Sequence, residues 1–485
     1  MKGELTLTRG KREAAVVRGA PYPARERTER ADRQPRPIYV VRTADMPVEL
    51  REVSPSADVA RADDRRPGER KQPVRFHGYF PSDGLTKSLT NAADMSGSAG
   101  FADAVLMSGN WFCDASGDGG ATWKRLDPTT IFPETLGGGF CCDQVITYVP
   151  EFDRFVWFLQ YRADGMGQGA FRIAAASAES VRNDPTAWTY WDFLAGDFGF
   201  ATNDMDYPDV AFSDEFLYVS TDVIGTGGRL VVRIPLADLA SGGTIGFEYT
   251  DPAESKTAWG AHLVQQTRSQ AVWVGHVDNS TLEVFTMPDG GTTYSSFRVS
   301  VAGWPNGSHS STGPDGNDWL KKLLEFPNFD VTGGVERHDG NVALAWSASK
   351  GKGPSGGFEF PQTHVRVAEI DMRARSLVSE MQVWNPDYAF AYPALAANAA
   401  DEVGIILGWG GASAHANCAM GILGDFVVWF RDDSTRTVER FGDYLTTRPT
   451  PKERTSFDGF GYSVLEVAGQ PDQCEYRPFY VRYGR

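Results

Sequence analysis

The stretch CCDQVITYVPEFDRFVWFLQY (residues 141–161) carries two apolar segments joined by a polar turn. Valine, isoleucine, phenylalanine, tyrosine and tryptophan dominate both segments, which is typical of two antiparallel strands. Five further stretches follow the same plan of a small or polar opening, a short strand, a polar turn and a strongly apolar strand. They cover residues 206–224, 259–277, 332–349, 392–410 and 442–465. A repeated unit of β-structure therefore organises the chain.

The spacing of these units indicates the size of the repeat. Successive units begin 65, 53, 73, 60 and 50 residues apart, and each is followed by one or two further strands such as RLVVRIPL (229–236). About four strands in this length is the size of a β-propeller blade, whereas a β-sandwich array needs about 90–100 residues per domain. Residues 103–126 add about three strands and residues 477–485 a last one. We therefore expect an all-β fold over residues 76–485, a single β-propeller of six or seven four-stranded blades, closed by pairing N- and C-terminal strands.

The composition of the 485 residues excludes several classes of protein. Aromatic residues make up 12% of the chain, which a low-complexity disordered sequence would not contain. No stretch approaches 18 consecutive apolar residues, so the sequence predicts no transmembrane helix and no membrane partner. Helical patterns are nearly absent, apart from residues 235–241 and 317–326.

Charge is distributed unevenly along the chain. The whole chain has 47 Lys and Arg against 63 Asp and Glu, but residues 1–75 hold 18 basic and 12 acidic residues with few apolar ones. A segment of this composition cannot bury enough surface to offset its ordering entropy, so we expect residues 1–75 to be a disordered basic arm. The arm could contact an anionic partner, or it could be a solvated tail or reflect a wrongly chosen start codon. The acidic remainder argues against duplex nucleic acid as a partner.

The cysteines and the N-terminus bear on the cellular compartment. Five cysteines form no disulfide framework and no CxxC zinc motif, and no apolar segment follows a basic start as in a secretory signal peptide. We expect a cytoplasmic monomer, with export by another route left open. The adjacent Cys141 and Cys142 are not expected to bridge each other. Beside Asp143 they could form a redox or thiolate site, with buried structural cysteines as the alternative.

One short motif is specific. SGDGGATW (116–123) fits the pattern S-x-D-x-G-x-T-W, with the fixed positions occupied by Ser116, Asp118, Gly120, Thr122 and Trp123. These residues are expected to build a hairpin turn in which Asp118 accepts amide hydrogens and glycine permits a positive φ. The motif resembles the Asp-box, or BNR repeat, of the sialidase-like propeller superfamily. That resemblance, extended loosely by the repeated units over about residues 100–485, implies a propeller whose Asp-box is structural and remote from its active site.

A second, partial resemblance to the same superfamily is the sequence Arg233-Ile234-Pro235. Sialidases carry an F/Y-R-I-P motif whose arginine binds the substrate carboxylate, but there it precedes the Asp-boxes and here it follows one. A blade-edge arginine is the alternative for Arg233. The arginine triad, the Tyr–Glu pair and the acid/base aspartate of sialidases cannot be placed by motif. The resemblance therefore supports the fold and does not carry the activity.

Candidate site residues follow from the position of the repeated units. The first strand of each blade lines the central channel of a propeller, so the opening residues of the units should point into its funnel. The expected catalytic carboxylates are Asp143, Asp206, Asp209, Asp443 and Glu336, and the expected substrate-binding residues are Tyr207, Trp259, His262, Arg337, Tyr392, Tyr444 and Arg448. Paired carboxylates can serve as acid and base, aromatic rings suit sugar faces, and arginine suits a carboxylate. A ring of hydrogen-bonded, water-filled channel residues without a ligand is the alternative.

Metal and nucleophile motifs are absent. The seven histidines show no HxH or HExxH spacing, and there is no G-x-S-x-G elbow and no P-loop. The segment PDGND (314–318) offers side-chain oxygens of the kind that bind calcium, so a calcium site remains an alternative, although the full calcium-loop pattern is missing. No cofactor is expected. The long insert at residues 303–329 is either a lid or binding loop, or a cap on a blade.

Two classes of function fit these observations. The first is a sialidase-like glycoside hydrolase acting on an acidic or neutral sugar from the central funnel. The second is a non-catalytic propeller that binds a glycan, peptide or protein partner on the same face, and a lyase or isomerase in the same funnel also fits. Carboxylates that converge within about 5–10 Å would favour hydrolysis, because both hydrolytic geometries need two carboxyls at such distances. A flat aromatic face without paired carboxylates would favour binding.

Overall fold

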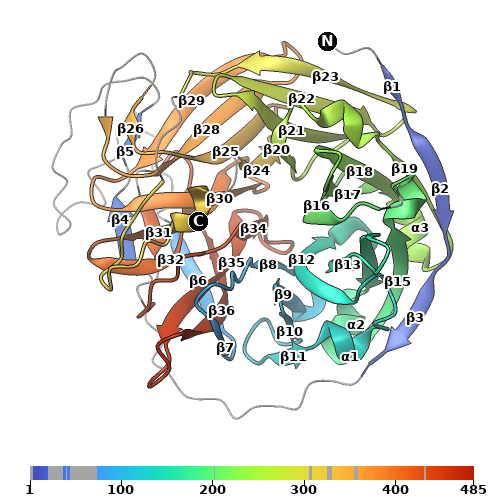
Figure 1. Cartoon of the computed structure of the whole chain (residues 1–485), viewed down its shortest axis with the longest axis horizontal. Coiled ribbons are helices and arrows are strands. Elements are labelled where there is room, and N and C mark those ends of the chain that lie inside the picture. The colour runs from blue at the N-terminus through green and yellow to red at the C-terminus, as the bar shows by residue number, and fades with distance from the viewer. Residues whose placement is uncertain are drawn as a thin grey trace.

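The computed structural model describes residues 4–19, 36–39, 41–43, 74–200, 202–304, 309–324, 330–353, 359–425, 427–430 and 433–485. Seven antiparallel sheets of four or five strands stand in a ring around one axis (Figure 1). The prediction of a single all-β propeller is confirmed, and the number of blades is seven.

The blades follow one another along the chain, and each begins with the strand nearest the axis. Blade 1 consists of β8 (Ser96–Ala99), β9 (Val105–Gly109), β10 (Phe112–Ser116) and β11 (Lys124–Leu126). Blade 2 consists of β12 (Phe140–Val149), β13 (Arg154–Tyr161), β14 (Ala170–Ala176) and β15 (Ala187–Leu194). Blade 3 consists of β16 (Met205–Phe212), β17 (Phe216–Val223), β18 (Gly228–Pro235) and β19 (Ile245–Tyr249). Blade 4 consists of β20 (Trp259–Leu263), β21 (Gln270–Asp278), β22 (Thr281–Pro288) and β23 (Thr293–Ser300).

The last three blades complete the ring. Blade 5 consists of β24 (Val331–Glu336), β25 (Val342–Ala348), β28 (His364–Asp371) and β29 (Ser376–Trp384), with the small hairpin β26 (Gly351–Lys352) and β27 (Glu359–Phe360) inserted. Blade 6 consists of β30 (Ala389–Ala397), β31 (Val403–Gly411), β32 (Ala414–Ile422) and β33 (Val427–Phe430). Blade 7 consists of β34 (Thr446–Pro449), β35 (Ser456–Glu466), β36 (Gln473–Gly484) and β6 (Arg75–Pro81), and β7 (Leu85–Ser88) pairs with the other half of β36. The six repeated units of the sequence are the first two strands of blades 2 to 7, and β6 closes the ring on the C-terminal strand as expected.

Helices are short and lie between strands. They are α1 (Pro128–Ile131), α2 (Ala178–Asn183), α3 (Leu236–Ser241) and the 3₁₀ turns η1 (Phe101–Asp103), η2 (Pro150–Phe152), η3 (Ala195–Phe198), η4 (Pro252–Ser255) and η5 (Lys321–Leu324). The helix expected at residues 235–241 is α3. Of the helix expected at residues 317–326, the described part forms only η5. In the described parts of the chain no helix is long and apolar enough to cross a membrane.

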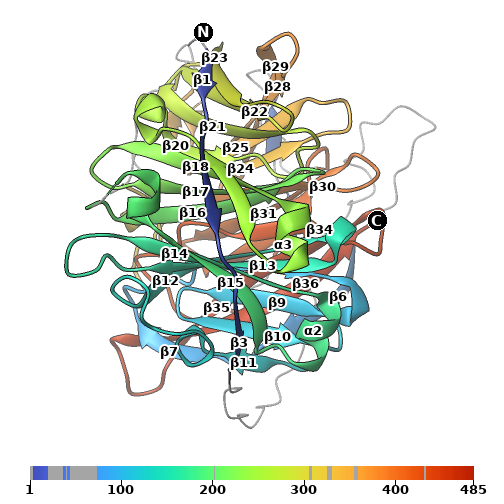
Figure 2. The ribbon, with the colours of Figure 1, turned by 90° about the vertical axis from the view of Figure 1, so that its right-hand side faces the viewer.

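An N-terminal belt runs along the outside of the ring. We use this name for β1 (Leu5–Thr6), β2 (Thr8–Arg12) and β3 (Ala15–Arg18). β1 pairs with β23 of blade 4, β2 with β19 of blade 3, and β3 with β15 of blade 2, all antiparallel (Figures 1 and 2). The belt thus adds a fifth strand to three blades in the reverse of their chain order. Two further strands, β4 (Arg36–Tyr39) and β5 (Val41–Thr43), extend blades 6 and 5.

The disorder expected for residues 1–75 does not hold for residues 4–19, 36–39 and 41–43, which contain strands β1 to β5. The composition argument counts only the surface that a segment buries on itself, whereas the open edge of each blade offers it backbone partners. The acidic blades also offer carboxylates: Arg9 lies 2.5 Å from Glu248, and Arg12 lies 2.5 Å from Asp197. This part of the basic arm therefore has its anionic partner within the same chain. Residues 1–3, 20–35, 40 and 44–73 lie outside the described residues.

Aromatic and arginine side chains fill the space between neighbouring blades. Between blades 1 and 2, the rings of Trp157 and Trp188 lie 5.2 Å apart, and Phe132 packs edge-on against Trp157. The buried Arg172 stacks 4.3 Å from the ring centre of Tyr190 and bonds a carboxylate. Such packing fixes the sheets against one another and so fixes the strands that surround the axis.

The SGDGGATW motif forms the turn between β10 and β11, in the outer part of blade 1. Asp118 accepts hydrogen bonds from the backbone N–H of Thr122 (2.8 Å) and from its hydroxyl (2.6 Å). Ser116 donates to Asp118 (2.7 Å) and accepts from the N–H of Gly120 (2.8 Å). Trp123 packs against the apolar core that blade 1 shares with blade 7. All five motif residues thus lie in this outer turn.

Candidate functional site

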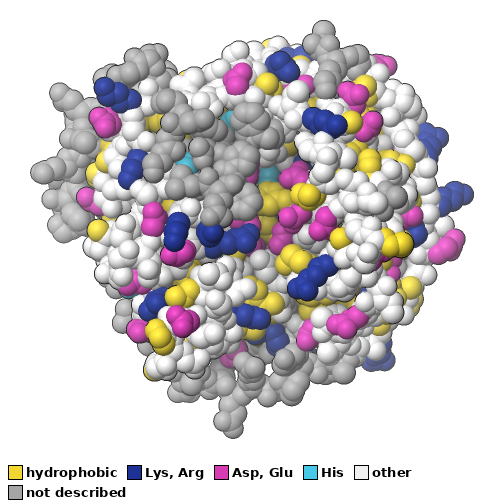
Figure 3. All heavy atoms as spheres, in the orientation of Figure 1, with side chains coloured by type: hydrophobic (Ala, Val, Ile, Leu, Met, Phe, Trp, Pro, Cys, Tyr) yellow, Lys and Arg dark blue, Asp and Glu magenta, His cyan; other side chains and the backbone are white. Residues whose placement is uncertain are grey.

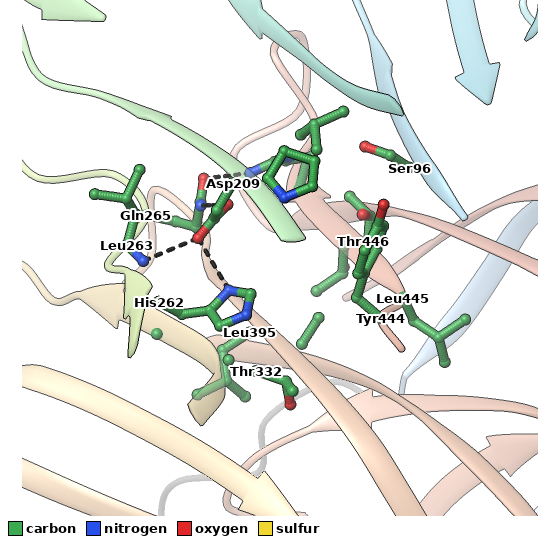
Figure 4. A pocket seen from close by; sticks show the side chains of 17 residues that line it. Ser96, Asp209, His262, Leu263, Gln265, Thr332, Leu395, Tyr444, Leu445 and Thr446 are labelled. Carbon is green, nitrogen blue, oxygen red and sulfur yellow. Dashed lines mark hydrogen bonds and ion pairs between the residues drawn. The ribbon is translucent and has the colours of Figure 1, made fainter. Parts of the chain in front are cut away.

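The first strands of all seven blades line one pocket in the channel (Figure 4). The lining includes Ser96 of β8, Val145 of β12, Asp209 of β16, His262 of β20, Thr332 of β24, Leu395 of β30 and Arg448 of β34. The empty volume of the pocket is about 490 Å³, and part of this volume is open to solvent. The axis of the propeller therefore contains a polar pocket.

A β-bulge opens three of these first strands at the same place. The register shifts between Asp206 and Asp209 in β16, and equivalent shifts occur near the start of β20 and β30. Within these bulges Tyr207, Gly260 and Tyr392 each have φ of 55°. Left-handed backbone is unfavourable for tyrosine, so the fold holds two tyrosines in a strained conformation beside the channel. A proline follows each tyrosine, and a bulge tolerates proline because it needs no ladder N–H there.

Tyr207 reaches across the channel from blade 3. Its hydroxyl donates to the backbone oxygen of Asp443, which precedes β34 of blade 7 (3.4 Å). Its ring lies edge-on to His262 and Tyr444, with centroid distances of 5.2 and 6.1 Å. We call Tyr207, His262 and Tyr444 the aromatic layer. It lies between the pocket and the end of the channel where the first strands begin.

Four aspartates and one arginine gather at that end, and we call them the acidic mouth. They are Asp94, Asp143, Asp206, Asp443 and Arg440. Arg440 bonds the Asp443 carboxylate, and the N–H of Asp443 donates to Asp94 (2.5 Å). Figure 3 shows acidic and hydrophobic side chains around a hollow at the middle of the ring.

Burial and mutual repulsion favour protonated carboxyls in the acidic mouth. Burial, and then the charge of Asp443, raise the pKa of Asp94 to about 7 against the opposing charge of Arg440. Burial, and then the charges of Asp94, Asp206 and Asp443, raise the pKa of Asp143 well above its ordinary value. Burial also raises the pKa of Asp443, although Arg440 opposes it. The cluster therefore holds protons under conditions in which a solvated aspartate is fully ionised.

The four aspartates differ in what they can contact. Asp94 is fully buried and accepts a hydrogen bond from Asn110 (2.7 Å). Asp143 is 7% exposed, and no side-chain hydrogen bond of it occurs among the described residues. Asp206 is exposed, and Gln160 holds its carboxylate by a hydrogen bond of 3.0 Å. Asp143 and Asp206 are thus the two carboxyls that remain available to a ligand.

Asp209 lies deeper, in the pocket, and its oxygens are occupied. They accept from the backbone N–H groups of Val210 (2.8 Å) and Leu263 (2.9 Å) and from Nδ1 of His262 (3.1 Å). Burial would raise the pKa of Asp209, but the His262 bond and nearby cationic charges hold it below its ordinary value. Asp209 therefore orients His262 as an ionised partner.

Glu336 and Arg337 lie at the opposite end of the channel from the acidic mouth. Val331 begins β24 beside the mouth, whereas Glu336 ends the same strand and bonds Arg268 (3.0 Å). Arg337 bonds Glu369 and Asp401, both at 2.9 Å. A six-residue strand spans about 17–20 Å, which separates these two residues from the other candidates.

The remaining candidates lie around the mouth and the pocket. Tyr444 and Arg448 line the pocket. Tyr392 is 4% exposed and packs against Trp319 and Phe441 in the core, so its ring does not line the pocket. Trp259 begins β20, and its side chain lies outside the described residues.

Sequence reasoning missed three members of this region: Asp94, Arg440 and Asp330. Asp94 lies just before β8, whereas the sequence pattern places strands of blade 1 only from residue 103 onward. Arg440 and Asp330 likewise precede the first strands of their blades. The sequence pattern could have identified Arg440 and Asp330, because each lies two residues before the start of a repeated unit.

Cys141 and Cys142 form a disulfide with each other, which corrects the expectation that these neighbours would not bridge. Both lie in β12 inside the irregular register between Phe140 and Gln144. Because the backbone there is not held in a regular ladder, it can adopt the shape that a ring between adjacent residues requires. Asp143 follows directly, so the disulfide borders the acidic mouth.

No group of three or more His, Cys, Asp or Glu residues that could hold a metal ion occurs in the part of the chain that the structure describes. Asp315 belongs to the segment 314–318, whose side-chain oxygens were considered above as possible calcium ligands. Its carboxylate accepts from the N–H of Thr437 (2.8 Å) and lies 3.7 Å from His415.

The Asp330→Asn variant is expected to be more stable than the wild type above pH 7, by about 2–4 kcal/mol, and equally stable near pH 4. Burial, and then the charges of Asp222 and Asp443, raise the pKa of Asp330 to about 7, against Arg229. The folded chain therefore binds a proton that the unfolded chain has released between about pH 4 and 7, so wild-type stability falls over this interval. Chemical denaturation of both proteins at pH 4, 6 and 8 measures the difference. A variant that loses stability at pH 8 contradicts the expectation.

Comparison with known proteins gives likeness of structure only. No protein-family model matches the sequence, and no curated protein matches it either. A GH93 α-L-arabinofuranosidase of Fusarium graminearum, solved with arabinobiose, is 10% identical with a TM-score of 0.38, over 82% of this chain and 97% of that one. A Penicillium chrysogenum α-L-arabinanase, also solved with arabinobiose, is 7% identical with a TM-score of 0.38, over 82% and 98%.

A Dyadobacter fermentans protein of unknown function is 11% identical with a TM-score of 0.40, over 85% of this chain and 99% of that one. These similarities are too low to carry an inference about activity.

Proposed function

We propose that this chain is a glycan-acting enzyme, a glycoside hydrolase whose active site is the acidic mouth. The observation that supports this most is the pair Asp143 and Asp206, two carboxyls from neighbouring blades in one electrostatic cluster. One is buried with a raised pKa, and the other is exposed and held by Gln160. Glycoside hydrolysis requires such a pair, because one carboxyl must keep a proton while the other is ionised.

The environment of each residue gives its role. Asp143 acts as the general acid, because its buried carboxyl keeps the proton that the departing glycosidic oxygen needs. Asp206 acts as the base or nucleophile, because it faces solvent and its carboxylate is oriented. Tyr207 and Tyr444 present ring edges and faces of the kind that pack on sugar rings. Asp94 lacks access, Asp443 is bonded by Arg440, and the oxygens of Asp209 are occupied.

The sialidase-like type is a narrower form of the same proposal. It would require arginines that face the carboxylate of an acidic sugar, and Arg440 at the mouth already bonds Asp443. The assay must therefore include both acidic and neutral sugars, so that it distinguishes between these two classes of substrate.

The test is a panel of aryl glycosides and oligosaccharides, with neutral sugars, uronides and sialosides, incubated with the full chain. We expect turnover of at least one member, and loss of that turnover in the Asp143→Asn, Asp206→Asn double variant with unchanged circular dichroism and no fall in Tm. Calorimetric titration of the same glycans into the double variant separates binding from catalysis. Binding without any wild-type turnover would support the non-catalytic glycan-binding propeller and contradict the hydrolase.

A further inference from the structure

Arg448 carries an unpaired charge in the channel. The four most buried arginines, Arg172, Arg229, Arg233 and Arg366, each bond a carboxylate. Arg448 forms no ion pair within the described ranges, and its two terminal nitrogens bond neutral oxygens, the side-chain oxygen of Gln265 and the backbone oxygen of Ile146. Burial lowers the pKa of Arg448 to about 10, against the charge of Asp209. Arg448 is partly exposed, but its Nε atom is buried, and cations shielded from water are normally paired, so a negative partner would be stabilising at this place.

Three polar atoms of the same pocket have no hydrogen-bond partner among the described residues. They are Nε of Arg448, Nε2 of His262 and the hydroxyl of Tyr444. His262 and Tyr444 are 6% and 8% exposed. All three side chains line the pocket, where His262 and Tyr444 contribute from the aromatic layer, and Figure 4 shows these two residues on opposite sides of the pocket. Buried polar groups left unpaired lower stability, and a ligand that bonds them recovers it.

Asp209 is not the missing partner of these atoms. Its oxygens already accept from Val210, Leu263 and His262. By accepting from Nδ1 of His262, it fixes the ring so that Nε2 is the nitrogen left over. Only the protonated form of an imidazole donates from both nitrogens, so an anion at Nε2 would bind that form of the ring.

We infer that the pocket below the aromatic layer is a binding site for a small carboxylate, held by Arg448, His262 and Tyr444. A carboxylate offers two oxygens with about four acceptor positions, which matches one guanidinium, one imidazole and one phenol donor. Its charge supplies the partner that Arg448 lacks. The seven first strands converge on this pocket, so it suits a ligand of the size of acetate or the carboxylate end of a sugar acid. The site shares Tyr444 with the proposed sugar-binding surface, but Arg448 and His262 are not members of the acidic mouth, so carboxylate binding does not depend on hydrolysis there.

The acidic mouth does not exclude an anion from the channel. Arg440 carries a charge that offsets that of Asp443. Burial raises the pKa values of Asp94 and Asp143, which disfavours the charged forms of these two carboxyls. The negative charge that a ligand meets is therefore smaller than the number of aspartates implies.

The test is calorimetric titration of acetate into the full chain at constant ionic strength, with sodium glucuronate as a second ligand and chloride as the control. We expect acetate or glucuronate to bind and to raise Tm with concentration. The Arg448→Gln variant should bind about ten- to hundredfold more weakly, the range for loss of a charged hydrogen bond. The matched Arg337→Gln variant should bind as the wild type does, because Arg337 lies at the other end of the channel with both its carboxylate partners.

Further variants keep the inference testable if Arg448→Gln fails to fold. Tyr444→Phe removes only the hydroxyl and should weaken acetate binding several-fold with little change in Tm. Tighter binding of glucuronate than of acetate would identify a sugar acid as the source of the carboxylate, and the reverse would identify a free small acid. Equal Tm shifts with chloride and acetate, or equal affinity in the wild type, Arg448→Gln and Tyr444→Phe, would overturn the inference.

Discussion

Turnover by the Asp143→Asn variant is expected to fall about a thousandfold on oligosaccharides and much less on aryl glycosides with acidic leaving groups. A sugar alkoxide needs a proton as it departs, whereas a nitrophenolate does not. The substituted amide keeps the size of the side chain but has no proton to give. Steady-state kinetics on a leaving-group series measures this, because the logarithm of kcat/KM should acquire a steep dependence on leaving-group pKa in the variant alone.

Two further variants separate catalysis from folding. Asp206→Asn should lose turnover on every substrate regardless of the leaving group, because the attack on the sugar carbon is then impaired. Asp401→Asn, at the other end of the channel, should keep wild-type kcat/KM, because its carboxylate bonds Arg337 far from the mouth. An equal fall in Asp143→Asn across the whole leaving-group series would remove Asp143 from the role of acid.

Deletion of residues 1–19 is expected to lower Tm and to cause association at high concentration. Three blades would lose their fifth strand, which leaves the edges of β15, β19 and β23 open to other chains. The belt also buries Leu7 at 7% exposure and brings Arg9 to Glu248. Calorimetry at a fixed scan rate and size-exclusion chromatography over a concentration series measure both effects.

A pair of substitutions tests the belt in the intact chain. Leu7→Asp should cost about 3 kcal/mol, because a buried leucine is replaced by a charge in the same apolar cluster. Val16→Asp should cost little, because Val16 is 79% exposed on the neighbouring strand β3. A peptide of residues 4–19 should restore Tm to the truncated chain. Equal effects of the two substitutions would mean that the belt does not pack as described.

The blades could be predicted from sequence because their signals are local. Each of the six repeated units is a pair of strands and the turn between them, so its pattern lies within about 20 residues of chain. The belt gave no such signal. Its strands pair with partners far along the chain, as Leu5 does with Tyr294, and its polar composition describes a segment that cannot fold alone. The sequence left six or seven blades open, because the strands β8 to β11 of blade 1 are short and give a weak pattern.

The sequence predicts which candidate residues lie on the strands around the channel, but it does not predict which of them lie close together. The opening of each unit marks a strand that surrounds the axis, so the sequence predicts that Asp143, Asp206 and Arg448 lie at the channel. Which of them share a space depends on where a strand begins and ends. Glu336 ends β24, so the full length of that strand separates it from the mouth. Bulges such as the one around Tyr207 shift the register and cannot be read from an alternating pattern.

The reverse order of the belt strands has a consequence for synthesis on the ribosome. Leu5 is made 289 residues before its partner Tyr294, and at about 5–20 residues per second the wait is roughly 15–60 seconds. The partner of β3 emerges first, then that of β2, then that of β1, so the segment can close onto the nascent chain from β3 towards its own N-terminus. A segment that must stay unpaired for this time has to remain soluble by itself. Its net positive charge, from four basic residues against two acidic ones between residues 4 and 19, helps to keep the segment in solution during that time.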